Sequence, residues 1–260
     1  MKEGFPIEEI TVLLLTYNEQ ENIGNVLKKL SWAKQILVID SGSTDDTLRL
    51  LEETPNLRYL YRKFDSFAQQ CNFGLAQIKT DWVLSLDADY LLSDALIEEI
   101  QHLDPDPEIA GYRVGFIYAV YGKPLRGTIY PPRTVLYRRR AAHYVDEGHG
   151  HRVSIAGRVS DLQGKIIHDD RKPLDRWFSA QCTYARREAD YLEQLEAGEG
   201  DRADQLRKKL WLMPGIVFFY TLLYKGCILD GWPGWFYVMQ RTLVEFMIAV
   251  ALLDRRLRGN

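Results

Sequence analysis

Cysteine is scarce in this sequence, and the few cysteines present lie far apart. The chain of 260 residues contains three, Cys71, Cys182 and Cys227. Their spacing excludes a disulfide framework and a cysteine-based zinc motif, and it favours a reducing compartment. The start of the chain, MKEGFPIEEI, also lacks the apolar core of a signal peptide. We therefore expect a cytoplasmic protein.

An excess of charge of one sign is missing as well. The formal net charge is −3, and 27% of the residues are charged. Because no overall basic excess points to nucleic acid, we expect no nucleic-acid partner. The hydrophobic share of 46% is enough for one large domain, or for a domain with an appendage, around a sizeable core.

The first part of the chain alternates between apolar runs and helix-like segments. The apolar runs are continuous, as is typical of strands whose two faces are both covered. They span residues 10–17, 35–40, 57–61 and 82–87. The helix-like segments between them span 20–31, 44–53 and 66–78. This alternation predicts a parallel α/β sheet with right-handed crossovers.

Three polar clusters fall at the ends of predicted strands. They read TYNEQEN (16–22), DSGSTDD (40–46) and DAD (87–89). In parallel α/β sheets, ligands bind in the crevice outside the carboxyl ends of the strands. The three clusters are therefore predicted to meet in one binding site.

The carboxylates of these clusters suit two kinds of ligand. Asp40 is placed to accept hydrogen bonds from a base or a ribose, and the alternative is a helix cap, a position that Asp favours. Asp87 and Asp89 offer oxygen ligands for magnesium or manganese, which complete their shells with water and substrate phosphates. The alternative for this pair is a solvated turn at the end of a strand.

The order of motifs along the chain resembles that of glycosyltransferase family 2. Within the family, the similarity is greatest to the branch of lipopolysaccharide-core glucosyltransferase-like proteins. It covers most of the chain. The motifs are LTYNEQENI (15–23), VIDSGSTDDT (38–47), QCNFGL (70–75), WVLSLDADY (82–90), GYRV (111–114), YPPRTVLYRR (130–139), IIHDD (166–170) and LDGWPGW (229–235).

This resemblance implies a fold and a reaction. The fold is GT-A, an α/β Rossmann-like fold with a mostly parallel sheet flanked by helices. The reaction is an inverting transfer of a hexosyl group from a nucleotide-diphosphate sugar, expected to be a UDP-sugar. The expected acceptor is a cell-envelope glycan or a lipid-linked molecule, and the expected cofactor is divalent manganese or magnesium.

The family pattern also implies roles for individual residues. His168 resembles the C-terminal histidine that completes the metal shell in many GT-A enzymes, and a structural histidine is the alternative. The residues expected on the metal are Asp87, Asp89 and His168. The residues expected near the donor nucleotide are Thr16, Asn18, Glu19, Asp40, Gln70, Asn72 and Asp87.

The general base that deprotonates the acceptor is expected in the segment YVDEGHGHRV (144–153). The related branch usually carries a His-Glu-Arg-Val run there, and this chain departs from it with Gly-His-Arg-Val at 150–153. The glutamate of the family is therefore replaced. Asp146 and Glu147 are the first candidates for the base, with His151 as the third, and a merely polar loop is the alternative.

The character of the sequence changes after residue 172. We expect a catalytic domain over 1–172, with a nucleotide-sugar half at 1–90 and an acceptor half at 91–172. A helical region follows at 173–260, and its first helix is predicted at 173–197, beginning at Pro173.

Basic and apolar residues adjoin in the helical region. The basic cluster Arg207–Lys209 precedes an apolar run of fifteen residues, Leu210–Tyr224, which is too short for a clean membrane span and contains a proline and a glycine. A second run, Phe246–Leu253, ends in DRRLRGN. This pattern suits peripheral contact with an anionic membrane, here the inner face of the cytoplasmic membrane. Packing of these helices on the catalytic domain or on a dimer partner is the alternative.

Two other functions fit the same motifs. A polyprenyl-phosphate glycosyl synthase of the same fold needs no base but needs a basic acceptor pocket, which Arg133, Arg138 and Arg139 are candidates to form. A non-catalytic regulator that binds nucleotides is the other possibility. The intact pair Asp87 and Asp89 argues against it.

Overall fold

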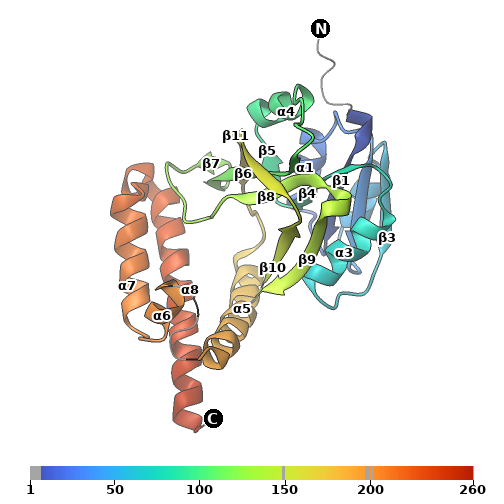
Figure 1. Ribbon diagram of the computed structural model, residues 1–260. Helices are drawn as coiled ribbons and strands as arrows, with labels where there is room; N and C mark the ends of the chain where they lie inside the picture. Colours follow the sequence, from blue (N-terminus) through green and yellow to red (C-terminus); the bar gives the residue numbers. More distant parts are fainter. Residues whose placement is uncertain (1–6, 148–149, 197–199, 201, 260) are drawn as a thin grey trace. The chain divides into compact units, whose positions relative to one another are not determined.

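The computed structural model describes residues 7–147, 150–196, 200 and 202–259 (Figure 1). The chain divides into two compact units. Unit 1 comprises residues 1–118 and 130–171, and unit 2 comprises 119–129 and 172–260. The division at 171 lies beside the boundary expected at 172, while the short segment 119–129 groups with the C-terminal helices. The further division of unit 1 at residue 90 stays a prediction.

The first half of the sheet in unit 1 is parallel. It contains β1 (Ile10–Thr16), β2 (Ile36–Asp40), β3 (Leu57–Tyr61) and β4 (Trp82–Asp87). Their spatial order is β3-β2-β1-β4, and neighbouring strands run in the same direction. Every residue of β2 is buried, and so is nearly every residue of β1. The four strands lie within a residue or two of their predicted positions, which confirms the α/β prediction.

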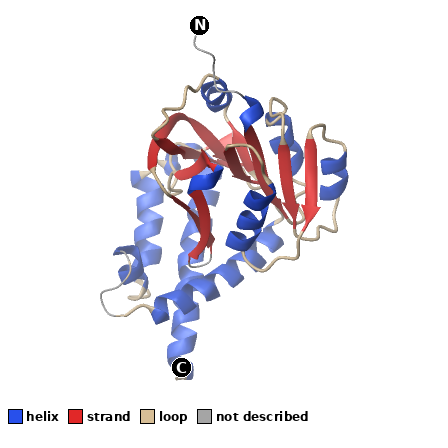
Figure 2. Ribbon diagram, turned by 45° about the vertical axis from the view of Figure 1, so that its right-hand side comes forward, coloured by secondary structure: helices blue, strands red, loops and turns tan. Residues whose placement is uncertain are grey.

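Helices cover both faces of these strands (Figure 2). They are α1 (Ile23–Lys29), α2 (Thr47–Glu52), α3 (Phe67–Gln77) and α4 (Asp94–Gln101). The last two begin after serine N-caps, because the hydroxyl of Ser66 accepts from Gln69 N–H and that of Ser93 accepts from Leu96 N–H. The first two are shorter than predicted, since the residues before them are held in loops by side-chain hydrogen bonds.

The second half of the sheet is mixed. Short strand β5 (Tyr90–Leu92) follows the Asp87–Asp89 turn, and β6 (Ile109–Val120), β8 (Arg133–Arg138) and β11 (Arg158–His168) complete the order β4-β8-β6-β11-β5. Strand β8 is antiparallel to both β4 and β6, and β11 is parallel to β6. The parallel arrangement predicted from the sequence therefore holds for the first half of the sheet, and the second half contains antiparallel pairs.

A separate hairpin carries the predicted base region. It consists of β9 (Ala142–Glu147) and β10 (Gly150–Ile155), which pair with each other in an antiparallel two-stranded sheet. Two short 3-10 helices, η1 (Ile7–Glu9) and η2 (Arg139–Ala141), precede β1 and this hairpin.

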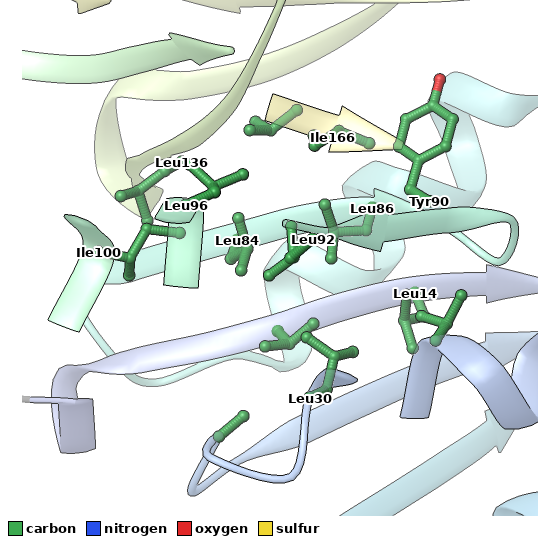
Figure 3. Packing of buried hydrophobic residues seen from close by; sticks show 14 of the residues in the cluster. Leu14, Leu30, Leu84, Leu86, Tyr90, Leu92, Leu96, Ile100, Leu136 and Ile166 are labelled. Atoms are coloured by element: carbon green, nitrogen blue, oxygen red, sulfur yellow. The ribbon is translucent and has the colours of Figure 1, made fainter. Parts of the chain in front are cut away.

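The core of unit 1 has one cluster on each face of the sheet. Leu14, Leu84 and Leu136 belong to the larger cluster, in which α1 and α4 also bury their apolar sides (Figure 3). Leu13 and Val83 point to the opposite face and pack with residues of α3. Successive residues of β1 and β4 thus contribute to different clusters, as the alternation of side chains along a strand requires.

Unit 2 is built from helices and one short β-hairpin. The helices are α5 (Leu174–Gln194), α6 (Arg202–Arg207), α7 (Leu212–Phe219), the π-helical turn η3 (Tyr220–Tyr224), η4 (Cys227–Asp230) and α8 (Gly231–Arg258). Strand β7 (Lys123–Pro124) pairs with the end of β6 inside this unit. This confirms the predicted helical extension. Pro173 is the N-cap of α5 rather than its first residue.

An ion network lies at the centre of unit 2. The guanidinium of Arg207 donates to Glu245 at 2.8 and 3.0 Å and to Glu188 at 3.1 Å. The ammonium of Lys208 donates to the carbonyl of Leu195 at 2.7 Å. Two residues of the basic cluster that the sequence suggested as a membrane contact are therefore used to join α5, α6 and α8.

Helix α8 is longer than the sequence pattern indicated. With the turn before it, the segment Cys227–Arg258 is long and apolar enough to cross a membrane by length and composition alone. One third of its most apolar stretch, 33%, is buried, and it packs against α5 and α7. Because the core helix of a soluble protein passes the same test, this is weak evidence for a span. Helix α7 with η3 is a shorter apolar segment.

Candidate active site

The carboxyl ends of β1, β2 and β4 bring the three polar clusters of unit 1 together. In the parallel registers Thr16 is the partner of Asp40, and Leu15 is the partner of Asp87. The three segments therefore leave the sheet side by side at one edge, as predicted. The polar side chains at this edge are of two kinds. Some are fully hydrogen-bonded within the chain, and others are charged groups that face one another.

Asp40 lies at the end of β2 and is held entirely by its own chain. Its Oδ2 accepts from the hydroxyl of Thr16 at 2.8 Å and from the hydroxyl of Ser43. Its Oδ1 accepts from the N–H groups of Gly42 and Ser43 at 2.8 and 2.9 Å. Only 2% of the residue is exposed. The carboxylate shapes the turn that follows β2; it is not the N-cap of α2, a position that Asp46 occupies.

The loop after β1 is fastened to the loop after β2. Asn18, with a positive φ of 54°, donates its N–H to Ser43 Oγ at 2.8 Å and accepts from the N–H of Thr44 at 2.7 Å. The N–H of Glu19 donates to Thr47 Oγ1 at 2.6 Å. These bonds run between segments more than twenty residues apart, so the two loops form one rigid rim at this edge.

Gln70 and Asn72 tie α3 to its neighbours. The amide of Gln70 donates to Ser41 Oγ and to the carbonyl of Arg62, both at 2.9 Å, and only 1% of the residue is exposed. The amide of Asn72 donates to the carbonyl and accepts from the N–H of Tyr144, each at 2.9 Å. Contact of either side chain with a donor stays a prediction, since their hydrogen bonds in the structure are structural.

Asp89 and His168 contact each other, unlike the polar residues described so far, which bond mainly to the backbone and to hydroxyl groups. His168 Nε2 lies 3.2 Å from Asp89 Oδ2, and the two side chains are 12% and 13% exposed. Strand pairing accounts for the approach, because β11 places His168 opposite Tyr90, the residue after Asp89. Asp87 lies outside this pair: its side chain is 40% exposed and its Oδ2 is 3.9 Å from an Arg133 nitrogen.

Three tyrosine rings surround His168. The centroids of Tyr90, Tyr118 and Tyr130 lie 5.3, 5.0 and 4.9 Å from that of the imidazole, all edge to face. The hydroxyls of Tyr90 and Tyr130 are hydrogen-bonded to each other at 3.0 Å. The rings fix the plane of the imidazole and leave its Nε2 on Asp89. Sequence reasoning missed these tyrosines, because an aromatic residue in a strand is indistinguishable from an ordinary core residue.

The Asp89–His168 pair fits a divalent metal of the expected kind. Bonds of about 2.1 Å at a right angle put two ligand atoms roughly 3 Å apart, close to the 3.2 Å observed between Oδ2 and Nε2. Nδ1 of His168 is buried, with no hydrogen-bond partner among the described residues. Within the part of the chain that the structure describes, no group of three or more His, Cys, Asp or Glu residues is close enough to hold a metal. A metal here would need water or substrate oxygens to complete its shell.

The hairpin candidates for the base differ in what the structure shows. Asp146 accepts from the hydroxyl of Ser66 at 2.8 Å and from the N–H of Ala68 at 3.3 Å, so its carboxylate lies at the N-terminus of α3. Its neighbour across the hairpin is His151. The side chains of Glu147 and His151 lie outside the described residues. The identity of the base therefore stays a prediction.

The three arginines proposed for a basic pocket lie at the two ends of β8 and at the start of η2. Arg133 begins the strand, beside Asp87. Arg138 donates to the carbonyl of Ile109 and lies over the ring of Trp82, and Arg139 donates to the carbonyl of Thr80. Since Trp82 and Thr80 are at the amino end of β4, two of the three arginines are far from the carboxyl edge. They do not form one pocket with Arg133.

A polar contact behind the site was not anticipated. Asn22 donates to Glu19 and to Asp170, each at 3.2 Å, and accepts from the N–H of Arg171 at 3.0 Å. Arg171 in turn donates to Asp169 at 2.8 Å. These bonds join the loop after β1 to the end of β11, which carries His168. The motif IIHDD contained Asp169 and Asp170, but its sequence does not indicate which loop they contact.

Comparisons with known proteins identify the family of the chain. The profile described as "Glycosyl transferase family 2" matches residues 11–162, more than half of the chain. The lipopolysaccharide core biosynthesis glycosyltransferase LpsC of Rhizobium meliloti is 27% identical over 265 residues, which cover 95% of this chain and 92% of LpsC. A poly-beta-1,6-N-acetyl-D-glucosamine synthase of Staphylococcus aureus is 33% identical over 112 residues, covering 40% of this chain and 27% of that protein.

Solved structures show a distant likeness. The crystal structure of S. aureus TarS 1–349 in complex with UDP-GlcNAc gives a TM-score of 0.49 at 13% identity, covering 96% of this chain and 92% of the other. That of glucosyl-3-phosphoglycerate synthase from Mycobacterium tuberculosis gives 0.47 at 16% identity, covering 75% and 81%. The predicted family is confirmed by the profile match: the chain belongs to glycosyltransferase family 2, and it is a glycosyltransferase.

Proposed function

We propose that this glycosyltransferase performs an inverting, metal-assisted transfer of a sugar from a nucleotide-diphosphate donor, with UDP as the nucleotide. The observation that supports this most directly is the Asp89–His168 pair beside Asp87 at the end of β4. Oxygen and imidazole ligands together suit manganese or magnesium, with manganese favoured by the nitrogen. When bound there, such an ion neutralises the charge that develops on the departing diphosphate.

The other residues of the site have supporting roles in this proposal. Thr16, Asn18, Glu19 and Asp40 belong to the rim at the ends of β1 and β2, on the side where the nucleotide is expected. Its internal hydrogen bonds hold the rim in one conformation before the donor arrives, which lowers the entropic cost of binding. Gln70 supports that rim from α3 through Ser41, and Asn72 joins α3 to Tyr144 in the hairpin β9–β10.

The acceptor needs a base to remove its proton. We place this base in the hairpin β9–β10, where Asp146, Glu147 and His151 are the candidates. Because Asp146 is engaged by α3, Glu147 and His151 become the stronger ones. Replacing the true base, as Glu147→Gln or His151→Asn, should lower kcat by about 10²- to 10⁴-fold while donor binding is retained. If neither change nor Asp146→Asn slows transfer, the acceptor is already ionised, as a polyprenyl phosphate is.

The proposed acceptor is a cell-envelope glycan or a lipid-linked molecule. The similarity to LpsC over almost the whole chain supports an acceptor of the lipopolysaccharide-core kind. A polyprenyl-phosphate synthase is less well supported, since Arg138 and Arg139 are held at the opposite end of β4.

The donor is tested by calorimetry with a panel of nucleoside diphosphates and Mn²⁺. UDP is expected to bind more tightly than GDP, ADP or CDP, and EDTA is expected to abolish both the Mn²⁺-dependent part of this binding and sugar transfer. Tighter binding of another diphosphate would replace UDP in the proposal. Full transfer activity in EDTA would refute the metal-assisted mechanism.

We further propose that unit 2 contacts an anionic membrane surface through an exposed apolar face. On α7 and η3 this face contains Leu212, Ile216, Phe219 and Leu223. On α8 it contains Met239, Leu243, Phe246 and Val250. Both sets recur every three or four residues, so each lies along one side of its helix. Exposed apolar surface of this extent marks an interaction site.

Cations flank the apolar face at the turn between the two helices. Lys225 follows η3, and Arg126 is bound to the same turn through Asp230, at 3.3 Å. Trp232 and Tyr224 are among the most exposed aromatic residues of the turn. Tryptophan, tyrosine and lysine are the residues that favour a membrane interface. The attraction to anionic lipid is therefore placed at this turn instead of at the Arg207–Lys209 cluster.

Liposome sedimentation tests the membrane proposal. The protein should bind vesicles with anionic lipid, and salt and Trp232→Ala should each weaken binding, while Tyr61→Ala in unit 1, at a similarly exposed tyrosine, should not. Equal binding to neutral and anionic vesicles would remove the electrostatic part. No binding, together with a dimer in sedimentation equilibrium, would assign the face to a second copy of the chain.

A further inference from the structure

Arg133 occupies a distinctive position in the sheet of unit 1. It is the first residue of β8, which is antiparallel to β4 with Trp82 opposite Arg138 and Leu84 opposite Leu136. Toward Arg133 the strand is irregular, with a register shift against β6 between Leu136 and Thr134. The ion-pair distance places the side chain, because an Arg133 nitrogen lies 3.9 Å from Asp87 Oδ2. A guanidinium therefore adjoins the carboxylates at the carboxyl edge.

The guanidinium of Arg133 is held in position, but its N–H groups are not used in hydrogen bonds to the described residues. Its carbon lies 5.1 Å from the centroid of the Tyr130 ring, in cation–π contact. The 3.9 Å approach to Asp87 is longer than a hydrogen bond. The side chain is 40% exposed, and the described residues provide no hydrogen-bond acceptor for any of its five N–H donors. Arg133 is thus held on one face and has its donors available on the edge where the donor substrate is expected.

The charge of Arg133 is permanent. An arginine side chain is not deprotonated in folded proteins. The ring of Tyr130 that supports Arg133 also contacts His168, and its hydroxyl is bonded to Tyr90. One aromatic cluster therefore orients both the imidazole beside Asp89 and the guanidinium beside Asp87.

We propose that Arg133 is a binding residue for the diphosphate of the sugar donor, and that Asp87 holds its guanidinium until the donor arrives. This rests on the proposed function, because it assigns a further contact to the same substrate. A guanidinium can bind two phosphate oxygens at once in a planar fork, which an ammonium cannot. The loose pair with Asp87 costs little to exchange for a doubly charged group, since an exposed ion pair is weak.

The same arrangement predicts opposite effects on two ligands. Arg133 repels a divalent cation at the neighbouring carboxylates and attracts a diphosphate. Removing its charge should therefore strengthen the binding of Mn²⁺ alone and weaken the binding of a diphosphate. A residue that only packs against Tyr130 would change both affinities in the same direction when it is lost, because both ligands would suffer from a disturbed site.

The experiment compares the wild-type protein with Arg133→Gln and Arg133→Lys by calorimetry. The probes are Mn²⁺ alone and, at saturating Mn²⁺, UDP, uridine and inorganic pyrophosphate. Pyrophosphate reports on the diphosphate contact whichever base the donor carries. The control is Arg158→Gln, which removes an exposed arginine from a comparable pair, 3.8 Å from Glu108.

For Arg133→Gln we expect UDP and pyrophosphate to bind about 10- to 100-fold more weakly. Uridine should bind unchanged, and Mn²⁺ alone should bind a few-fold more tightly. Arg133→Lys should recover part of the affinity for UDP, because it restores the charge without the fork. Arg158→Gln should match the wild type with every probe.

Two results would overturn the proposal. One is UDP and pyrophosphate affinity in Arg133→Gln equal to that of the wild type. The other is a parallel loss of Mn²⁺, UDP and uridine binding, which would make Arg133 a structural residue. Failure of the proposed function would look different, since the wild-type protein itself would bind neither Mn²⁺ nor any nucleoside diphosphate.

Discussion

Two groups of polar residues meet at the carboxyl edge of unit 1, and they differ in how their side chains are used. The rim group, Asp40, Gln70 and Asn72, is hydrogen-bonded within the chain, and the first two are almost fully buried. The strand-end group, Asp87, Asp89, His168 and Arg133, contains charged or polar atoms that face each other at 3.2 to 3.9 Å. The rim group maintains a shape, whereas the strand-end group has charges that a ligand can rearrange.

The difference shows that an aspartate at a strand end can serve either purpose. Asp40 and Asp87 both follow an apolar strand, and both lie beside β1. Asp40 is followed by a glycine and a serine whose N–H groups turn back onto it, so its charge is satisfied locally. Asp87 has no such turn and is half exposed beside an arginine. This difference is the reason for proposing that the second group carries the chemistry.

The largest effect is expected from Asp89→Asn. This change keeps the shape of the side chain but removes the charge next to His168, so it should lower transfer by about 10³-fold through loss of metal-assisted charge stabilisation. Thermal unfolding should change little. Asp94→Asn, at an exposed aspartate paired with Lys29, is the matched control and should keep full activity. An active Asp89→Asn enzyme would make the strand-end group an ordinary turn.

A smaller effect, on stability rather than on turnover, is expected from Asp40→Asn. The new amide would present donors to N–H and hydroxyl groups that now donate to a carboxylate, at a cost of about 1–3 kcal/mol. For a chain of this size that corresponds to a fall in Tm of several degrees. Thermal unfolding measures it, and UDP affinity is then compared for the folded protein. Lower affinity at unchanged Tm would instead show direct contact between Asp40 and the nucleotide, as the family resemblance implies.

The sequence predicted the strands and the family of this protein well, and it predicted the roles of individual polar residues poorly. The strands β1 to β4 were located because continuous apolar runs have few alternative interpretations. The motif order then identified the family. The roles of Asp40, Gln70 and Asn72 depend on which backbone groups surround them, and Asn72 contacts Tyr144, a residue more than seventy positions away. Likewise, the tyrosines around His168 come from three different strands or loops, and no local pattern reveals their convergence.

The third effect separates capping from catalysis at Asp146. Asp146→Asn leaves one oxygen in place of the two that now accept from the Ser66 hydroxyl and the Ala68 N–H, and Ser66→Ala removes the bond to Asp146 together with the N-cap bond to Gln69 N–H. If these bonds are structural, Asp146→Asn should lose about 1 kcal/mol of stability and Ser66→Ala should lose more, with kcat nearly unchanged in both. Chemical denaturation and initial rates measure the two quantities. A large fall in kcat for Asp146→Asn alone would return Asp146 to the role of general base.

The smallest effect is expected on the rate of cysteine alkylation. The rate at Cys71 measures how often the helix that carries Gln70 and Asn72 opens. Cys71 lies between Gln70 and Asn72 on α3, and burial, with the charges of Asp87 and Asp146, raises the pKa of its thiol. Burial also raises the pKa of Cys227 in unit 2, to about 11. Since the thiolate is the reactive form, only about one Cys227 in a thousand is ionised at pH 8. The exposed Cys182 should therefore be alkylated first.

Replacing a residue of the rim group should loosen the structure around α3. Asn72→Ala removes both hydrogen bonds from α3 to Tyr144, so local opening should become more frequent and Cys71 should be alkylated several-fold faster. Cys227 belongs to unit 2 and serves as the internal control, because its rate should not change. Mass spectrometry of the three cysteine peptides gives all the rates from one sample. If Asp89→Asn accelerated Cys71 labelling as much as Asn72→Ala, the strand-end group would share the structural role of the rim, and the distinction between the two would fail.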